Sequence, residues 1–392
     1  MPEPADQSRT IAILPLNMAG AWGGSELLWS SLARLWHGQG HRVHVGIRAW
    51  APMPQPILAL QDCGVDLHSY KPHPSIVPRA FAALSRRLGV QGPRRHPLHS
   101  WLRRMQPDLL VLSSDCLGGL PGIQLAASLR IPYAYIMQAN SESWWPDDDQ
   151  RAQMNAALDA ATGAICFVGE RNRDLFELQL GRRLAHSMIC RNPHAALGVD
   201  PLPWPHDPVD ANSGLRFAFV GRTEPIAKGQ DLLLQALAQP QWNDRPWSLS
   251  LFGSGHGTAG VAAMAELLGI SHRLHAVPAY SSLEAVWRDH HVLVMPSRYE
   301  GLPLALAEAM WLGRPAVVTD VADSGVLVRD GLDGFVASAP TVAHVGEALE
   351  RLWQHRHQLR ELGASAAARV RHFFPEDPVA AASEQILSLV PR

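Results

Sequence analysis

Short apolar runs recur along the whole sequence, and longer segments with helical spacing separate most of them. Several runs, such as the one at 108–114, are unbroken rather than alternating, which is typical of strands buried on both faces. Repeated alternation of strand and helix predicts parallel sheets with right-handed crossovers. The expected strands are 10–16, 41–47, 108–114, 132–139 and 163–169, and then 215–221, 247–253, 273–278, 291–297 and 315–320.

The strands fall into two groups, which predicts two sheets and two domains. The stretch 191–214 between the groups holds five prolines and has no helical period, so we interpret it as a linker. We expect an α/β fold with Rossmann-like domains at 1–193 and 194–374, facing each other across a cleft. A final helix lies within 375–392, and periodicity leaves open whether it packs back on the first domain. Because ligands bind beyond the carboxyl ends of parallel strands, the cleft is the expected site.

The composition excludes several classes of function. A net charge of −2 gives no general argument for binding nucleic acid. No apolar run reaches the length of a membrane span, and the polar start of the sequence is unlike a secretory signal. The four cysteines are scattered singly with no C-x-x-C pair, which fits a reducing compartment. We therefore expect a cytoplasmic protein.

The segment 297–310, SRYEGLPLALAEAM, carries two acids that need an explanation. Pro303 suits a helix start, so Glu300 should lie at the sheet edge and Glu308 on the helix that follows. That helix is apolar nearly all round and therefore buried, and a buried acid normally has a partner. The backbone N–H groups of Gly301 and Leu302 at the helix start suit negative or polar ligand oxygens. The plain alternative is a helix-start acid with a solvated Glu308.

The pattern E-G-x-P-x-x-x-x-E after P-S-x-x resembles the signature of family-four retaining glycosyltransferases, which have the GT-B fold. The segments FVGRTEPIAKGQDLLLQAL, SLFGSG, RPAVVTD and DGLDGFVA are similar to family segments and follow in the family's order, over roughly 215–340. The resemblance implies that Glu300 contacts hydroxyls of the donor sugar and that Glu308 holds the nucleotide ribose. It also implies backbone contacts from Gly301 and Leu302 to the sugar. The donor would lie on the second domain and the acceptor on the first.

Two cations, Arg222 and Lys228, follow the strand at 215–221. Together with the resemblance, their place at a strand's carboxyl end predicts that they stabilise the diphosphate released from a nucleotide-sugar. Removal of one such preorganised group typically costs about 3 kcal/mol of barrier. These cations would supply the positive charge that a metal gives elsewhere, so we expect neither a metal nor another cofactor. The plain alternative is two solvated loop cations.

Two loops of the first domain are further candidates. Gly23 and Gly24 precede a helix and would let a phosphate or an acceptor approach the backbone, as in the resembled family. After the strand at 132–139 the family commonly has a histidine, where this sequence has Gln138 and Asn140 nearby. Either amide can bind a sugar hydroxyl, but neither acts as a base at neutral pH. A flexible turn and amides that cap local backbone are the plain alternatives.

Two further stretches have a charge pattern that invites a function. The acids after Pro146 are interpreted as the start of a helix and not as a metal site, because acids are favourable there. Between Arg86 and Arg104 lie six arginines and no acid. That segment would attract an anionic membrane surface or a lipid-diphosphate acceptor, or it is simply a solvated loop.

We therefore predict a retaining, metal-independent glycosyltransferase that moves a sugar from a nucleotide-sugar to an acceptor hydroxyl. Its place would be in glycan, polysaccharide or glycolipid biosynthesis, with a glycan, a lipid-linked or a small-molecule acceptor. One alternative is a catalytically silent subunit that binds sugar nucleotides, since the usual histidine is absent. Another is a sugar-nucleotide epimerase of the same fold. The sequence leaves the base, the sugar and the acceptor open.

Overall fold

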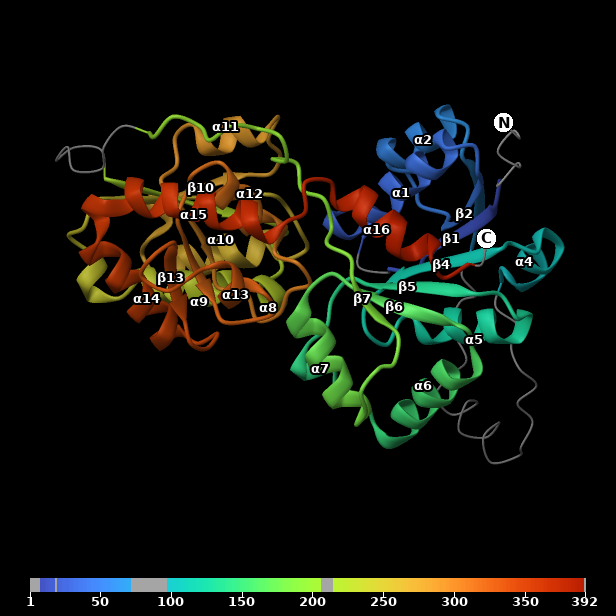
Figure 1. Ribbon diagram of the computed structural model, residues 1–392. Helices are drawn as coiled ribbons and strands as arrows, with labels where there is room; N and C mark the ends of the chain where they lie inside the picture. Colours follow the sequence, from blue (N-terminus) through green and yellow to red (C-terminus); the bar gives the residue numbers. More distant parts are fainter. Residues whose placement is uncertain (1–7, 18–19, 72–96, 206–213, 391–392) are drawn as a thin grey trace.

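The computed structural model describes residues 8–17, 20–71, 97–205 and 214–390. Figure 1 shows two lobes side by side, each built on a parallel sheet with helices on both faces. The first sheet has the order β3-β2-β1-β4-β5-β6-β7, and the second has the order β10-β9-β8-β11-β12-β13. The two parallel sheets expected from the sequence are confirmed. The strands are β1 Thr10–Pro15, β2 Arg42–Arg48, β3 Asp66–Tyr70, β4 Leu109–Ser114, β5 Tyr133–Met137, β6 Gly163–Phe167, β7 Ser187–Ile189, β8 Leu215–Val220, β9 Trp247–Phe252, β10 Leu274–Val277, β11 Val292–Met295, β12 Ala316–Thr319 and β13 Gly334–Ala337.

The ten expected strands are all present, but the sequence missed β3, β7 and β13. Each of the three lies at an edge of its sheet. β3 reads DLHSY and is half exposed, and β7 has three residues. β3 and β7 therefore leave no long apolar run in the sequence, whereas β13 reads GFVA, is mostly buried and was simply overlooked.

The helices before β13 lie in the crossovers between strands, and the last three helices follow β13. Those of the first domain are α1 Leu27–Gly38, α2 Gln55–Asp62, α4 His99–Met105, α5 Leu120–Leu129, α6 Asp148–Ala160 and α7 Glu170–Leu180. Those of the second are α8 Pro225–Lys228, α9 Gln230–Leu237, α10 Thr258–Leu267, α11 Leu283–Trp287, α12 Leu304–Trp311, α13 Ser324–Leu327, α14 Val342–Gln354, α15 Leu359–Phe373 and α16 Pro378–Leu387. The predicted helix start before α6 is confirmed, because Asp147 and Gln150 form a reciprocal capping box.

The last helix, α16, returns to the first domain and lies beside α1 (Figure 1). The indole Nε1 of Trp36 donates to Ser383 Oγ over 2.8 Å, with both residues buried. Arg9, just before β1, donates to the carbonyl of Leu387 at the end of α16. The structure thus decides which domain α16 covers, a point that its periodicity left open.

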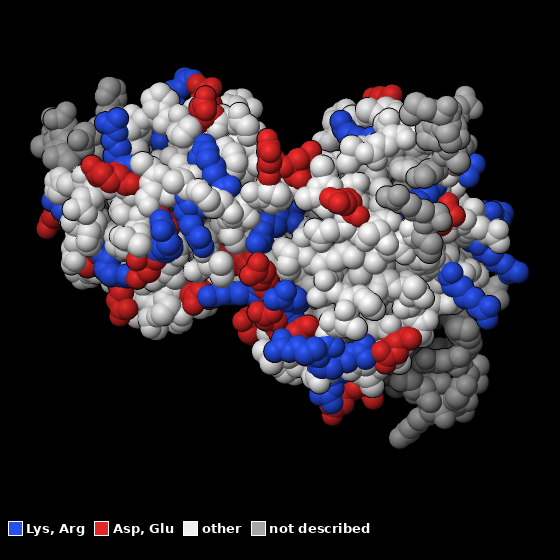
Figure 2. Space-filling view, viewed as in Figure 1, with Lys and Arg blue, Asp and Glu red and all other residues white. Residues whose placement is uncertain are grey.

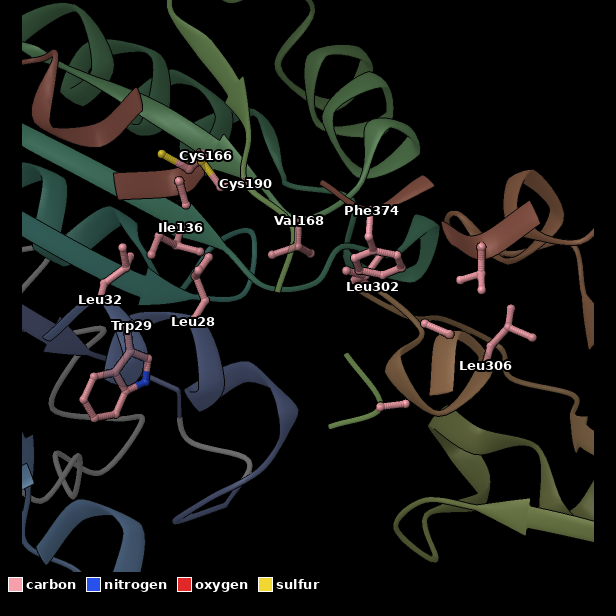
Figure 3. Packing of buried hydrophobic residues seen from close by; sticks show 14 of the residues in the cluster. Leu28, Trp29, Leu32, Ile136, Cys166, Val168, Cys190, Leu302, Leu306 and Phe374 are labelled. Carbon is pink, nitrogen blue, oxygen red and sulfur yellow. The ribbon is translucent and has the colours of Figure 1, made fainter. Parts of the chain in front are cut away.

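One hydrophobic cluster continues from the first domain into the second. Figure 3 shows it running from Leu28 and Ile136 of the first domain to Leu302 and Leu306 of the second, with Phe374 between. All five side chains are at most 6% exposed. Because their apolar surface is shared, separating the domains exposes it to water.

The arginine-rich segment is described only in part. Arg86, Arg87, Arg94 and Arg95 lie outside the described residues, whereas Arg103 and Arg104 are exposed on α4. Among the residues that the structure describes, no helix is long and apolar enough to cross a membrane.

Arg314 fastens the linker to the second domain. Its guanidinium, 1% exposed, donates to the carbonyls of Pro203 in the linker and Trp287 at the end of α11, both over 2.8 Å. It also donates to the carbonyl of His290 over 3.1 Å. Burial lowers the pKa of Arg314 to about 10, so the guanidinium is still charged at neutral pH. The three carbonyls that accept its hydrogen bonds stabilise this buried charge. The forked guanidinium reaches carbonyls that no single ammonium could reach together.

We predict that Arg314→Lys lowers the free energy of unfolding by about 3 kcal/mol, because several buried carbonyls lose their donor. Chemical denaturation measures the change. Arg360→Lys on the exposed face of α15 is the matched control and should be neutral within about 0.5 kcal/mol. Equal stability of the two variants would contradict this role for Arg314.

Candidate active site

Glu300 and Lys228 form an ion pair beside the carboxyl ends of β11 and β8. Lys228 Nζ lies 2.7 and 2.8 Å from the two carboxylate oxygens of Glu300. Ser297 Oγ donates to the same carboxylate over 2.7 Å. Glu300 is only 7% exposed. The structure therefore brings together an acid and a cation that the sequence placed 72 residues apart.

Gly229 explains how Lys228 reaches this position. α8 ends at Lys228, and Gly229 follows in the left-handed conformation with φ 69°. A Cβ atom on Gly229 would lie 2.0 Å from the carbonyl oxygen of Pro296. Only glycine allows this approach, which lays the end of α8 against the loop that carries Glu300.

Arg222 lies beside a hollow at the carboxyl ends of β8 and β9. Its half-exposed guanidinium forms a 3.2 Å ion pair with Glu224. Together with Thr223, Gly255 and His256, these residues line a cavity of about 430 Å³. The sequence interpretation gave no role to Gly255 and His256, although Gly255 ends the SLFGSG segment and His256 follows it. Backbone groups and the Arg222 guanidinium beside this cavity suit a phosphorylated ligand.

Glu308 lies on α12 and faces the linker. Its Oε1 accepts a hydrogen bond from the backbone N–H of Ala195 over 3.1 Å. Burial raises the pKa of Glu308 to about 7, partly offset by this hydrogen bond. By accessible surface Glu308 is half-buried, and its hydrogen-bond partner is a backbone N–H group and not a cation.

The Gly23–Gly24 loop meets the second domain. A Cβ atom on Gly24 would lie 2.7 Å from Leu304 Cδ1 at the start of α12, so the loop packs directly on that helix. The adjoining Glu26 is 5% exposed and accepts from Ser25 Oγ over 2.7 Å, and its burial raises the pKa of the carboxyl. The sequence interpretation overlooked Glu26, for which the one signal was an acid in front of an apolar helix.

The side-chain amides of Gln138 and Asn140 both form hydrogen bonds with other residues of the first domain. Gln138 Nε2 donates to Ser113 Oγ, and its Oε1 accepts from Asn192. Asn140 donates to Gln179 and accepts from the Ser141 backbone. Only the bond from the Ser141 N–H group to Asn140 matches the plain alternative of capping local backbone, because the other three join side chains that are distant in sequence. A donor-binding role for either amide stays a prediction, since a ligand would have to displace these partners.

It is the backbone of Gln138 that reaches the Glu300 loop. A Cβ atom on Gly301 would lie 1.7 Å from the Gln138 carbonyl oxygen, so the backbones of these two segments are in contact. Leu302 is 6% exposed and belongs to the shared hydrophobic cluster. Nearby, the ring of Trp144 from the first domain packs edge-on against Tyr299 at 4.7 Å. Glu300 is therefore enclosed from both domains.

Comparison with known proteins agrees with this geometry. The chain aligns over 97% of its length with HepE from Anabaena in complex with UDP, covering 100% of that chain, with a TM-score of 0.74 and 17% identity. It aligns over 97% with the lipopolysaccharide outer core galactosyltransferase WaaB, covering 99% of that chain, with a TM-score of 0.68 and 16% identity. The fold is thus GT-B, as predicted.

Residues 214–355, which lie in the second domain, match the model of the glycosyl transferases group 1 family. This confirms the resemblance found in the sequence. D-inositol 3-phosphate glycosyltransferase from Nocardia farcinica is 33% identical over 165 residues, which are 40% of this chain and 36% of that protein. The corresponding protein of Mycobacterium leprae is 33% identical over 212 residues, 52% of this chain and 44% of that protein. The chain therefore matches less than half the length of these relatives.

We predict strong coupling between Lys228 and Glu300 in the unliganded protein. Lys228→Met should lower the free energy of unfolding by about 3 kcal/mol, because it leaves a buried carboxylate without its cation. Lys228→Met with Glu300→Gln should recover at least about 1.5 kcal/mol of this loss. A double-mutant cycle by denaturation measures the coupling. The exposed pair Arg288 and Glu284 is the control and should show no measurable coupling, because water screens it. Additive effects at Lys228 and Glu300 would contradict the pairing.

We also predict a pH-dependent effect of Glu308→Gln. Because the pKa of Glu308 is raised from 4.5 to about 7, its contribution to stability is complete below pH 4.5 and is lost as the pH rises to 7. Glu308→Gln stays neutral, so its stability relative to wild type should rise across this window by up to about 2 kcal/mol after allowance for solvent screening. Unfolding at several pH values measures this. Glu347→Gln on an exposed position of α14 should show no such trend.

Proposed function

We propose that the protein is a retaining glycosyltransferase that uses a nucleotide-sugar donor. The observation that carries this proposal is the Glu300–Lys228 pair beside the Arg222 cavity, enclosed between two domains. The family of the second domain and the UDP-bound HepE neighbour support it. Three structures of HepE hold UDP, UDP with glucose, and UDP-glucose, which favours a UDP-sugar as the donor of this protein.

Donor binding would rearrange the charges that the unliganded site pairs with one another. The diphosphate would draw Lys228 away from Glu300 and Arg222 away from Glu224, since phosphate carries more charge than one carboxylate. The freed Glu300 carboxylate would then accept hydrogen bonds from sugar hydroxyls. Glu308 would accept from the ribose hydroxyls at the back of the site.

The chemical step would depend on charge stabilisation. As the bond between sugar and phosphate breaks, negative charge grows on the phosphate, and Lys228 and Arg222 stabilise it. The departing phosphate would take the proton of the acceptor hydroxyl, so the step requires no base at Gln138 or Asn140. Burial of Glu300 between the domains would exclude water, which would otherwise hydrolyse the donor.

The acceptor side of the proposal is broader. The acceptor would bind to the first domain, near the Gly23–Gly24 loop, and carry a reactive hydroxyl on a glycan, a lipid-linked sugar or a small molecule. A cytoplasmic location and a peripheral membrane contact through the arginines between Arg86 and Arg104 belong to this proposal. The exposure of Arg103 and Arg104 on α4 supports that contact.

The test is nucleotide release from a panel of UDP-, GDP- and other sugar nucleotides. We expect slow hydrolysis of one donor, reduced about 10²- to 10³-fold by Glu300→Gln and by Lys228→Met. Glu347→Gln, on the exposed face of α14, should retain full activity.

The alternative function is a catalytically silent subunit that binds sugar nucleotides. It is favoured because both polar atoms of the Gln138 amide already have hydrogen-bond partners in the protein. Tight binding of one sugar nucleotide with no turnover, even with cell-extract acceptors, would favour it over the enzyme.

A further inference from the structure

Helix α7 of the first domain has its N-terminal cap supplied by the second domain. Gly169 precedes the helix and has no side chain to cap it. Asp323, which comes just before α13 and is 1% exposed, accepts from the N–H groups of Glu170 and Arg171, both over 3.0 Å. A Cβ atom on Gly169 would lie 2.7 Å from Asp323 Oδ2, so glycine makes room for this carboxylate. Asp323 thus does across the interface what an N-cap residue does within one chain segment.

Ion pairs strengthen the same contact. Arg191 Nη1, in the linker, lies 3.6 Å from the Asp323 carboxylate, and Arg171 on α7 pairs with Asp320 of the second domain. Figure 2 shows acidic and basic side chains side by side at the junction of the two lobes. The start of α7 is therefore fixed relative to the second domain, which gives the next residues of α7 a defined position there.

Asn172, in the first turn of α7, uses this position to contact the Glu300 loop. Its side chain is 2% exposed, and its Nδ2 donates to the carbonyl oxygen of Gly301 over 3.1 Å. Gly301 is the residue after Glu300, and its other side touches the Gln138 carbonyl. The peptide that follows Glu300 is thus held between two elements of the first domain.

We propose that Asn172 is a positioning residue for the reaction, because it holds the Gly301 carbonyl and thereby sets the orientation of Glu300. This inference rests on the proposed function and extends it. Glu300 is mounted on the second domain, yet its backbone is oriented by the first. The site therefore takes its working geometry only when the domains are closed. A misplacement of about 1 Å is enough to cost up to about 10²-fold in rate.

The direct test uses Asn172→Leu, which keeps the approximate shape of the side chain and removes its donor. Asn155→Leu on α6 is the matched control, because Asn155 Nδ2 also donates to a carbonyl, that of Leu180, within the first domain. For the donor that the wild type hydrolyses, we expect kcat to fall about tenfold in Asn172→Leu with KM nearly unchanged. Asn155→Leu should leave kcat unchanged. Equal kcat in wild type and Asn172→Leu would overturn the inference and leave the proposed function intact.

A second measurement does not depend on turnover. Amide hydrogen exchange should be faster in the segment 297–310 of Asn172→Leu, by about fivefold, than in wild type or Asn155→Leu. UDP binding by calorimetry should be unchanged, since Asn172 lies on the first domain and the proposed nucleotide site on the second. Unchanged exchange in 297–310 would overturn the inference even if no sugar nucleotide is turned over. Faster exchange with no turnover in any variant would instead overturn the proposed function, and with it the role of Asn172 in the reaction, while the hold of Asn172 on the 297–310 segment would stand.

Discussion

A buried carboxylate is the constraint on which the arrangement of this protein depends. Glu300 is 7% exposed, and a charge so far from water needs a cation and hydrogen bonds. Lys228 and Ser297 supply both. Their approach requires that the loops after β8 and β11 meet, which parallel neighbouring strands allow because their carboxyl ends lie at the same edge.

Two glycines allow other segments to approach the Glu300 loop closely, one from each domain. Gly229 lets α8 lie on Pro296, and Gly301 lets the first domain touch the Glu300 loop. A side chain at either position would separate the groups that must meet. The same loop is therefore held by its own domain on one side and by the other domain on the opposite side, which links the charge of the site to the closure of the two domains.

Local patterns predicted much of this molecule. The alternation of apolar runs and helical segments predicted both parallel sheets. The edge strands β3 and β7 were missed because they are short or partly exposed and leave no long apolar run, and the apolar edge strand β13 was overlooked. For the site, the motif around Glu300 and the cations after β8 were visible as short patterns. Glu26 was overlooked, and Asn140 turned out to be bonded to Gln179 and Ser141.

The sequence by itself determined the fold class, the helix start at Pro303 and the separate positions of Glu300 and Glu308, because all of these follow from spacing along one segment. Only the tertiary structure decided which groups meet. Asn172 and Gly301 are 129 residues apart, and Asp323 caps a helix that begins 153 residues earlier. No local pattern records such contacts, because they depend on how two separately folded sheets pack against each other.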